Sequence, residues 1–246
     1  MKDLVAIDIG NSRVKFGSFK DGDLLERASS PLSEIRGATT AFVRGRDVPI
    51  VVASVVPAAA EVLREVLVGR DVRWVQAEQQ DVVSGVDSTM GADRLADAVA
   101  AWKIYGKGRK AVAVVGLGTA TTMLVVNGKG RVLGGFIAPG LGLTLASMHE
   151  QTALLPLLQM QGQTDKLGFD TESHMRNGVF VGHCGLVRQW LKTARKAAGD
   201  KVIRVATGGW SEAVSAAFPE GKVFDVVDRD LTLKGIFILA KAGGDL

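Results

Sequence analysis

The sequence is short of cysteine, of aromatic residues and of long apolar runs, and each shortage excludes a class of protein. Cys184 is the only cysteine, so no intrachain disulfide can form and a reducing compartment fits. No stretch approaches the roughly 20 apolar residues that span a bilayer. Asp8 interrupts the apolar start of the chain, which argues against a signal peptide. We therefore expect a cytoplasmic protein without a membrane partner.

Aromatic residues make up only 6% of the chain, and this shortage bears on the meaning of its basic charge. The sequence pI is about 9.3, but the formal net charge is only +4 and the Lys and Arg residues are scattered. Surfaces that bind nucleic acids usually cluster basic residues together with aromatics. The sequence therefore predicts no nucleic-acid partner.

The composition is otherwise that of an ordinary globular protein. Of the 246 residues, 47% are hydrophobic and 23% are charged. A chain of this length buries a substantial core and forms one large domain or two small ones. The glycines of residues 106–108 lie between two stretches of similar pattern. We expect one lobe over residues 1–108 and a second over residues 109–246.

The first of these patterns lies near the start of the chain. An apolar run from Leu4 to Ile7 leads into Asp8 and a tight turn at 10–12, and a strand resumes at Val14. Backbone N–H groups and hydroxyls at such a turn can hold phosphate oxygens. A carboxylate at the end of the strand can hold the divalent cation that bridges those oxygens. The alternative is an ordinary hairpin whose aspartate caps its own backbone.

The pattern returns roughly 110 residues later, and this repetition indicates two similar halves. A buried-strand run over residues 111–115 leads into a turn over 116–122, and a strand resumes over 123–126. Because clefts between domains are common ligand sites, we expect a phosphate chain to be held between the two turns.

A helix is predicted to begin just after Gly91, because Leu95, Val99 and Trp102 recur at helical spacing. Asp93 lies in its first turn, where the helix dipole favours a carboxylate. This charge has either a structural use at the helix terminus or a catalytic one.

These motifs, in this order, resemble those of the type III pantothenate kinases, in the actin/hexokinase/acetate-kinase superfamily. The resemblance covers nearly the whole chain and lies in residues 8–15, 91–94, 118–122, 134–141, 149–156 and 207–209. It implies an α/β fold of two similar actin/ribonuclease-H-like lobes, each a mixed sheet with flanking helices, with the active cleft between them. It also implies ATP-dependent phosphorylation of pantothenate to 4'-phosphopantothenate, the first step of coenzyme A biosynthesis.

The resemblance also implies roles for single residues. Asp93 would be the base that receives the proton of the substrate hydroxyl, and Asp8 would hold Mg²⁺. ATP would be bound by Asp8, Ile9, Gly10, Asn11, Ser12, Arg13, Val14 and Lys15 in the first half, and by Gly118, Thr119, Thr121 and Gly208 in the second. Pantothenate would be bound by Gly91, Ala92, Asp93, Arg94 and Thr171, since Arg suits bidentate contact with a carboxylate. We expect His149 and His183 to be structural.

The chain departs from the family pattern at several positions. Gly116 replaces the aspartate that helps to hold a monovalent cation, K⁺ or NH₄⁺, so we expect weak dependence on K⁺. The tyrosine and proline that shape the pantothenate pocket are absent from residues 81–90, and Asp170 stands where an asparagine is usual. Two alternatives follow from these changes. One is a kinase of the same fold for another small hydroxy acid, and the other is a non-catalytic nucleotide-binding accessory protein, as some family members were first described.

A homodimer is expected from the family and from the long helices of the second half. Gly178 and Gly182 lie one turn apart on a helix predicted over residues 171–197, where they allow another helix to approach closely. That second helix belongs either to the same chain or to another copy of it.

Overall fold

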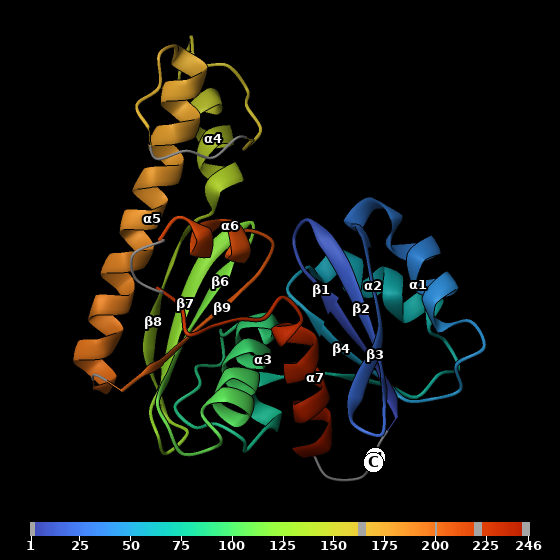
Figure 1. The fold of residues 1–246 in the computed structure, drawn as a ribbon. Coiled ribbons are helices and arrows are strands. Elements are labelled where there is room, and N and C mark those ends of the chain that lie inside the picture. The colour runs from blue at the N-terminus through green and yellow to red at the C-terminus, as the bar shows by residue number, and fades with distance from the viewer. Residues whose placement is uncertain (1–2, 162–165, 200, 219–222, 243–246) are drawn as a thin grey trace. The chain divides into compact units, whose positions relative to one another are not determined.

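The chain forms two compact units in the computed structural model, which describes residues 3–161, 166–199, 201–218 and 223–242 (Figure 1). Unit 1 comprises Met1–Ile104, Gly130–Val132 and Asp230–Leu246. Unit 2 comprises Tyr105–Lys129 and Leu133–Arg229. The chain therefore passes from one unit to the other more than once.

Unit 1 is built on a five-stranded mixed sheet. Its strand order is β3 (Asp23–Pro31), β2 (Arg13–Lys20), β1 (Leu4–Ile9), β4 (Ile50–Ser54) and β5 (Val72–Trp74). β1 is antiparallel to β2 and parallel to β4, so β1 lies at the centre with hydrogen bonds on both edges. The apolar run at the start of the sequence thus forms a central strand that is buried on both faces, as its continuous hydrophobicity requires.

Helices cover both faces of this sheet, and alternate side chains of β1 face different helices. The helical elements of unit 1 are η1 (Leu32–Glu34), α1 (Ile35–Val43), α2 (Pro57–Val66), η2 (Ala77–Gln79), α3 (Ala92–Ala100) and α7 (Leu231–Ala242), with a π-helical continuation η3 (Ala101–Tyr105) after α3. Val5, Ile7 and Ile9 pack in one core cluster with residues of α1 and α2. Because side chains alternate along a strand, Asp8 points to the other face, where α3 and α7 lie side by side (Figure 1).

Unit 2 repeats this architecture. Its strand order is β8 (Val132–Pro139), β7 (Ala120–Val126), β6 (Val112–Leu117), β9 (Ile203–Thr207) and β10 (Val226–Val227). β6 is antiparallel to β7 and parallel to β9, as β1 is to β2 and β4. The predicted fold of two similar lobes with mixed sheets is confirmed.

The helices of unit 2 are α4 (Leu141–Glu150), α5 (Thr171–Ala198) and α6 (Ser211–Ala216). α5 packs on β6 and β7, and its buried side chains join those of β6 in one core cluster. Figure 1 shows α4 beside the N-terminal half of α5, beyond the end of the sheet. Within the described ranges, no helix combines the length and the apolarity that a bilayer span requires.

Two features differ from the expected organisation. The last helix was expected in the lobe 109–246, whereas α7 belongs to unit 1, because its apolar face packs on α3. The sequence predicts a third strand of the second half over residues 131–133, directly before the glycines 134–135, but β8 continues to Pro139. A Cβ on Gly135 would lie 1.9 Å from the carbonyl oxygen of Met123, so this glycine lets two strands approach closely rather than forming a turn.

Candidate functional site

The first candidate group lies in unit 1, where Asp8 of β1 stands opposite Lys15 of β2 in the sheet register. The Lys15 Nζ atom lies 3.3 Å from Asp8 Oδ2. Both residues point to the face of the sheet that carries α7, since a Cβ on the neighbouring Gly17 would meet Leu233 of α7. The hairpin that the sequence predicted is therefore real, and its register creates the ion pair.

Asp8 is 4% exposed, and its Oδ1 atom has no hydrogen-bond partner within the part of the chain that the structure describes. Burial raises the pKa of Asp8, the negative charge of Asp93 adds to this effect, and Lys15 opposes it. A buried carboxylate oxygen without a partner is costly unless a cation or a donor meets it. Asp8 therefore fits a Mg²⁺ ion that keeps several waters and binds phosphate oxygens, which needs only one or two protein carboxylates.

The turn after Asp8 offers groups of two kinds. The Gly10 N–H donates to the carbonyl oxygen of Arg13 at 3.0 Å and so closes the turn. The side chains of Asn11, Ser12 and Arg13 are exposed, whereas those of Ile9 and Val14 are buried in the core. Ile9 and Val14 can contact a ligand only through their backbone. The Arg13 guanidinium also donates to Ser29 of β3, with its Nε atom 2.8 Å from Ser29 Oγ.

The second candidate group is the start of α3. Gly91 is the N-cap residue, and its carbonyl oxygen accepts from the Leu95 N–H at 3.1 Å. The Oδ1 atom of Asp93 accepts from the Arg94 N–H at 2.7 Å. A Cβ on Gly91 would lie 2.7 Å from this same oxygen and 3.1 Å from Cγ1 of Val55. The glycine of this motif thus leaves the space that the Asp93 carboxylate occupies.

The structure brings these two groups together on one face of unit 1. The charge of Asp93 acts on Asp8, and those of Asp93, Lys15 and Asp8 act on Asp97 in the next turn of α3. Sequence reasoning missed Asp97, which is 8% exposed. Its spacing of four residues from Asp93 was the available signal, because residues at i and i+4 share one face of a helix.

Unit 2 places two glycine turns beside each other. The Gly118 N–H donates to the carbonyl oxygen of Ala120 at 3.1 Å at the end of β6. Gly208 has φ +94°, and a Cβ there would lie 2.4 Å from the carbonyl oxygen of Leu117. Only glycine combines this backbone conformation with such close approach. Thr119 is exposed at the same turn, so three of the four predicted nucleotide residues of this half, Gly118, Thr119 and Gly208, lie together.

The fourth of these residues, Thr121, belongs to the same hairpin, but its side chain points away from the turn. Its side chain is 1% exposed, and its Oγ1 atom lies 2.8 Å from Nε2 of His183 on α5. Burial lowers the pKa of His183, so the imidazole is neutral at pH 7. The Thr121 hydroxyl is directed into the interior of unit 2, where it joins β7 to α5.

Gly116 occupies in β6 the position that Asp8 occupies in β1. It pairs with Thr122 of β7 and Thr207 of β9, as Asp8 pairs with Lys15 and Ala53. The Oγ1 atom of Thr207 is buried and has no partner among the residues described. Gly116 provides no side-chain oxygen beside Thr207, so a monovalent cation at this position would lack the carboxylate ligand that the resemblance implies.

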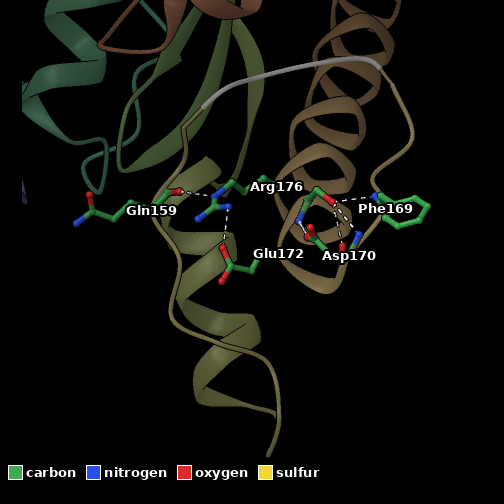
Figure 2. A network of polar contacts seen from close by, with 6 residues as sticks. Gln159, Phe169, Asp170, Glu172 and Arg176 are labelled. Atoms are coloured by element: carbon green, nitrogen blue, oxygen red, sulfur yellow. Dashed lines mark hydrogen bonds and ion pairs between the residues drawn. The ribbon is translucent and has the colours of Figure 1, made fainter.

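Thr171 is the first residue of α5 and is exposed. The Asp170 side chain caps the helix by accepting from the Ser173 N–H at 2.8 Å, and the Ser173 hydroxyl accepts in return from the Asp170 N–H at 3.0 Å (Figure 2). Arg176 donates to the carbonyl oxygen of Gln159 at 3.1 Å, which ties the preceding segment to α5. Asp170 therefore has a structural use, and Thr171 lies in unit 2, whereas Asp93 lies in unit 1.

Comparison with known proteins identifies the family. The sequence profile of the type III pantothenate kinases matches residues 4–193, which is more than half of the chain. The chain belongs to this family. It is 34% identical to the type III pantothenate kinase of Methylacidiphilum infernorum, over 97% of this chain and 88% of that protein. It is 30% identical to the enzyme of the same name from Dehalococcoides mccartyi strain CBDB1, over 95% of this chain and 93% of that protein.

Solved structures show the same fold. A Campylobacter jejuni protein described as a Baf family transcriptional activator superposes with a TM-score of 0.61 and 21% identity, over 97% of this chain and 98% of that chain. An inorganic polyphosphate/ATP-glucomannokinase from Arthrobacter gives 0.52 and 17%, over 97% and 98%. This type III pantothenate kinase is therefore an enzyme of the hexokinase-like fold that phosphorylates pantothenate, and the predictions of family, fold and activity are confirmed.

Proposed function

We propose that Asp93 orients the primary hydroxyl of pantothenate and receives its proton while ATP donates the phosphoryl group. The observation that carries this proposal is the grouping of Asp93 with Asp8 and Lys15 on one face of unit 1. Phosphoryl transfer proceeds mostly through a loose transition state, so a carboxylate can act late and mainly by positioning the nucleophile. An aspartate at the start of a helix is suited to this role because α3 holds its backbone rigidly.

The residues around Asp8 would hold the triphosphate. Mg²⁺ bound at Asp8 would neutralise phosphate charge during the transfer. Asn11, Ser12 and the ammonium of Lys15 would contact the phosphate oxygens of ATP, and the unit 2 turns at Gly118, Thr119 and Gly208 would add backbone donors and the Thr119 hydroxyl. Because the Thr121 hydroxyl is bonded to His183, Thr121 would serve this site through its backbone.

The acceptor would be held by the start of α3. Arg94 is half-buried and follows Asp93 in α3. Its guanidinium would bind the carboxylate of pantothenate while Asp93 meets the hydroxyl. Gly91 and Ala92 shape the backbone there, and Thr171 is proposed as a further substrate contact.

Substitution of Asp93 by asparagine tests this assignment. Asparagine keeps the shape of the side chain but cannot take the hydroxyl proton, so kcat should fall by roughly 10²–10⁴-fold. The measurement is a coupled assay of ADP release with ATP, Mg²⁺ and pantothenate, run alongside a panel of other small hydroxy acids. Asp71→Asn, the same change at an exposed aspartate of unit 1, is the matched control and should leave kcat unchanged.

Two outcomes would contradict the proposal. If Asp93→Asn retains the wild-type rate and melting temperature, Asp93 is a helix-terminal charge and not a catalytic group. If the wild-type protein phosphorylates only an acid other than pantothenate, the changes in residues 81–90 have altered the acceptor.

We also propose that this enzyme depends only weakly on monovalent cations, because Gly116 provides no carboxylate beside Thr207. Rates in Na⁺ and K⁺ buffers of equal ionic strength should agree within about tenfold. That difference is smaller than the roughly 10²-fold or larger loss of kcat expected when one transition-state contact is removed. Gly116→Asp should introduce stimulation by K⁺. A wild-type rate that differs by more than this between the two buffers would show that another group has replaced the carboxylate.

A homodimer formed through unit 2 is the third proposal. Most of the exposed large hydrophobic residues in the described chain fall within residues 133–181 of the sequence, namely Leu133, Phe136, Ile137, Leu143, Leu154, Leu157, Leu167, Phe169 and Val181. Exposed apolar residues that gather on one surface mark protein interfaces. A Cβ at Gly178 or Gly182 of α5 would meet nothing within 4 Å among the described residues outside the backbone of α5 itself, so a helix of the same chain does not pack there. A second copy is the partner that the family suggests, and a cytoplasmic location stays a prediction.

A further inference from the structure

A polar contact lies inside the packing of α3 against α7, one helical turn beyond Asp93. Asp97 Oδ1 accepts a hydrogen bond of 2.7 Å from the hydroxyl of Thr232, the second residue of α7. Both side chains are shielded from solvent, Asp97 at 8% and Thr232 at 5% exposure. The reaction assigned above uses neither residue.

Beside this hydrogen bond, the backbones of α3 and α7 are in direct contact. A Cβ on Gly235 of α7 would lie 2.0 Å from the carbonyl oxygen of Ala96 and 2.4 Å from its carbonyl carbon. Backbone atoms cannot move aside as a flexible side chain can, so α7 determines where this turn of α3 lies. The hydrogen bond adds a directional restraint to that packing, because it fixes the helices both along and around their axes.

We infer that Asp97 is a positioning residue for phosphoryl transfer, which acts with Thr232 to hold α3 where Asp93 faces Asp8 and Lys15. The inference rests on the proposed function, since it takes Asp93 as the group that meets the acceptor hydroxyl. Displacement of a reacting group by about 1 Å costs up to roughly 10²-fold in rate. A restraint one turn away on the same rigid helix is placed to prevent such a displacement.

The charge state of Asp97 supports this role. Burial raises the pKa of Asp97 to about 8, opposed by the Thr232 hydrogen bond and Lys15 and assisted by the charges of Asp93 and Asp8. The Asp97 carboxyl group is therefore mostly protonated, and so uncharged, at neutral pH. It accepts from Thr232 without adding a third negative charge to the Asp8–Asp93 pair, where the triphosphate must also bind.

Asparagine is the neutral side chain of the same shape, so it should replace Asp97 well at pH 7 and differ from it at higher pH. We expect Asp97→Asn to keep kcat within about threefold of wild type at pH 7. The wild-type kcat should then fall about tenfold relative to the variant by pH 9, because only the protonated fraction stays competent. Asp97→Ala and Thr232→Val, which remove the acceptor and the donor, should each lower kcat at least tenfold with KM for both substrates within threefold.

Thermal unfolding gives an independent measurement. An aspartate in an unfolded chain has a pKa of about 3.9, below that of folded Asp97. Between the two values the unfolded chain ionises while the folded one does not, so this group makes the protein less stable as pH rises from about 4 to about 8, and the loss is constant above that. The melting temperature of Asp97→Asn should therefore exceed that of wild type by a margin that widens from pH 5 to pH 8.

The experiment measures kcat, KM and melting temperature from pH 5 to 9 for wild type, Asp97→Asn, Asp97→Ala and Thr232→Val. Asp228→Asn is the matched control, a buried aspartate of unit 2 that accepts from a hydroxyl, that of Tyr105, at 2.7 Å. Asp228→Asn should keep the wild-type dependence of kcat on pH, unlike Asp97→Asn. Asp93→Asn is measured in parallel. If that variant keeps the wild-type kcat, the proposed function and this inference are both wrong. If Asp93→Asn behaves as proposed while folded Asp97→Ala and Thr232→Val keep the wild-type kcat, this inference alone is wrong.

Discussion

At the scale of single residues, Gly91 controls the position of the proposed catalytic carboxylate. Its backbone, with φ −58° and ψ 141°, lies in a region open to any residue, so the glycine is not needed for conformational freedom. The space for a Cβ is instead filled by the Asp93 carboxylate, 2.7 Å away. The glycine of this motif is therefore a steric requirement of the aspartate that follows it.

Gly91→Ala should consequently reduce kcat without unfolding the protein. The added methyl group must push the Asp93 carboxylate aside, and we expect a loss of about tenfold to 10²-fold in kcat. Steady-state kinetics and thermal unfolding measure the two effects. Gly37→Ala on α1, where a Cβ meets nothing within 4 Å, is the control and should leave kcat unchanged. Equal rates for Gly91→Ala and wild type would show that Asp93 tolerates the displacement.

Local motifs predicted much of the site at this scale, and their limit is also clear. The turn after Asp8 and the start of α3 could be predicted because each depends on residues that are neighbours in the sequence. The contact of Asp97 with Thr232 joins residues 135 positions apart, so no local pattern encodes it. The burial of Thr121 was also not predictable, because its partner His183 lies on a helix that comes much later in the chain.

At the scale of elements, the contact of α3 with α7 depends on Gly235. A Cβ there would overlap the backbone of Ala96, so Gly235→Ala should force the helices apart. We expect the free energy of unfolding to fall by about 3 kcal/mol, which is the upper end of the usual cost of overpacking a core. This loss exceeds the gain from the higher helix propensity of alanine. Denaturant titration measures this.

Gly37→Ala on α1 is the matched control for that experiment, because Gly37 lies outside the proposed dimer surface. Its Cβ would meet nothing within 4 Å, so the higher helix propensity of alanine should stabilise the chain by up to about 1 kcal/mol. A Gly235→Ala protein as stable as wild type would mean that α7 can shift on α3 without cost.

Several elements could be predicted from periodicity. The helices at 92–100 and 171–198 begin where the sequence predicts them, and the strand at 112–117 lies within two residues of its expected bounds, 111–115. The extension of β8 through Gly134 and Gly135 was missed, because a glycine pair usually indicates a turn. The position of α7 in unit 1 was missed because sequence order favours packing with the preceding strands, and only the fit of Gly235 to α3 opposes this.

At the scale of the whole molecule, the proposed homodimer is open to a direct test. The wild-type protein should sediment at micromolar concentration as a species of twice 26.0 kDa. Gly182→Glu should produce the 26.0 kDa species, because it places a charge on the exposed face of α5 where the chain itself leaves space. Glutamate favours a helix over glycine, so loss of assembly would not reflect a weakened helix.

Gly37→Glu, at an equally open position of α1, is the control and should stay dimeric. A wild-type protein that sediments at 26.0 kDa would exclude the dimer. Activity of a monomeric Gly182→Glu protein would further show whether one chain carries a complete site.

The return of the chain to unit 1 at Asp230 has a consequence for biosynthesis. On the ribosome, residues 92–100 emerge long before residues 231–242, so the side of α3 that packs on α7 stays uncovered until α7 leaves the exit tunnel. Nascent unit 1 must therefore wait, incompletely folded, while all of unit 2 is translated. A polypeptide that stopped near residue 229 would keep this surface exposed, as a target for chaperones and proteases.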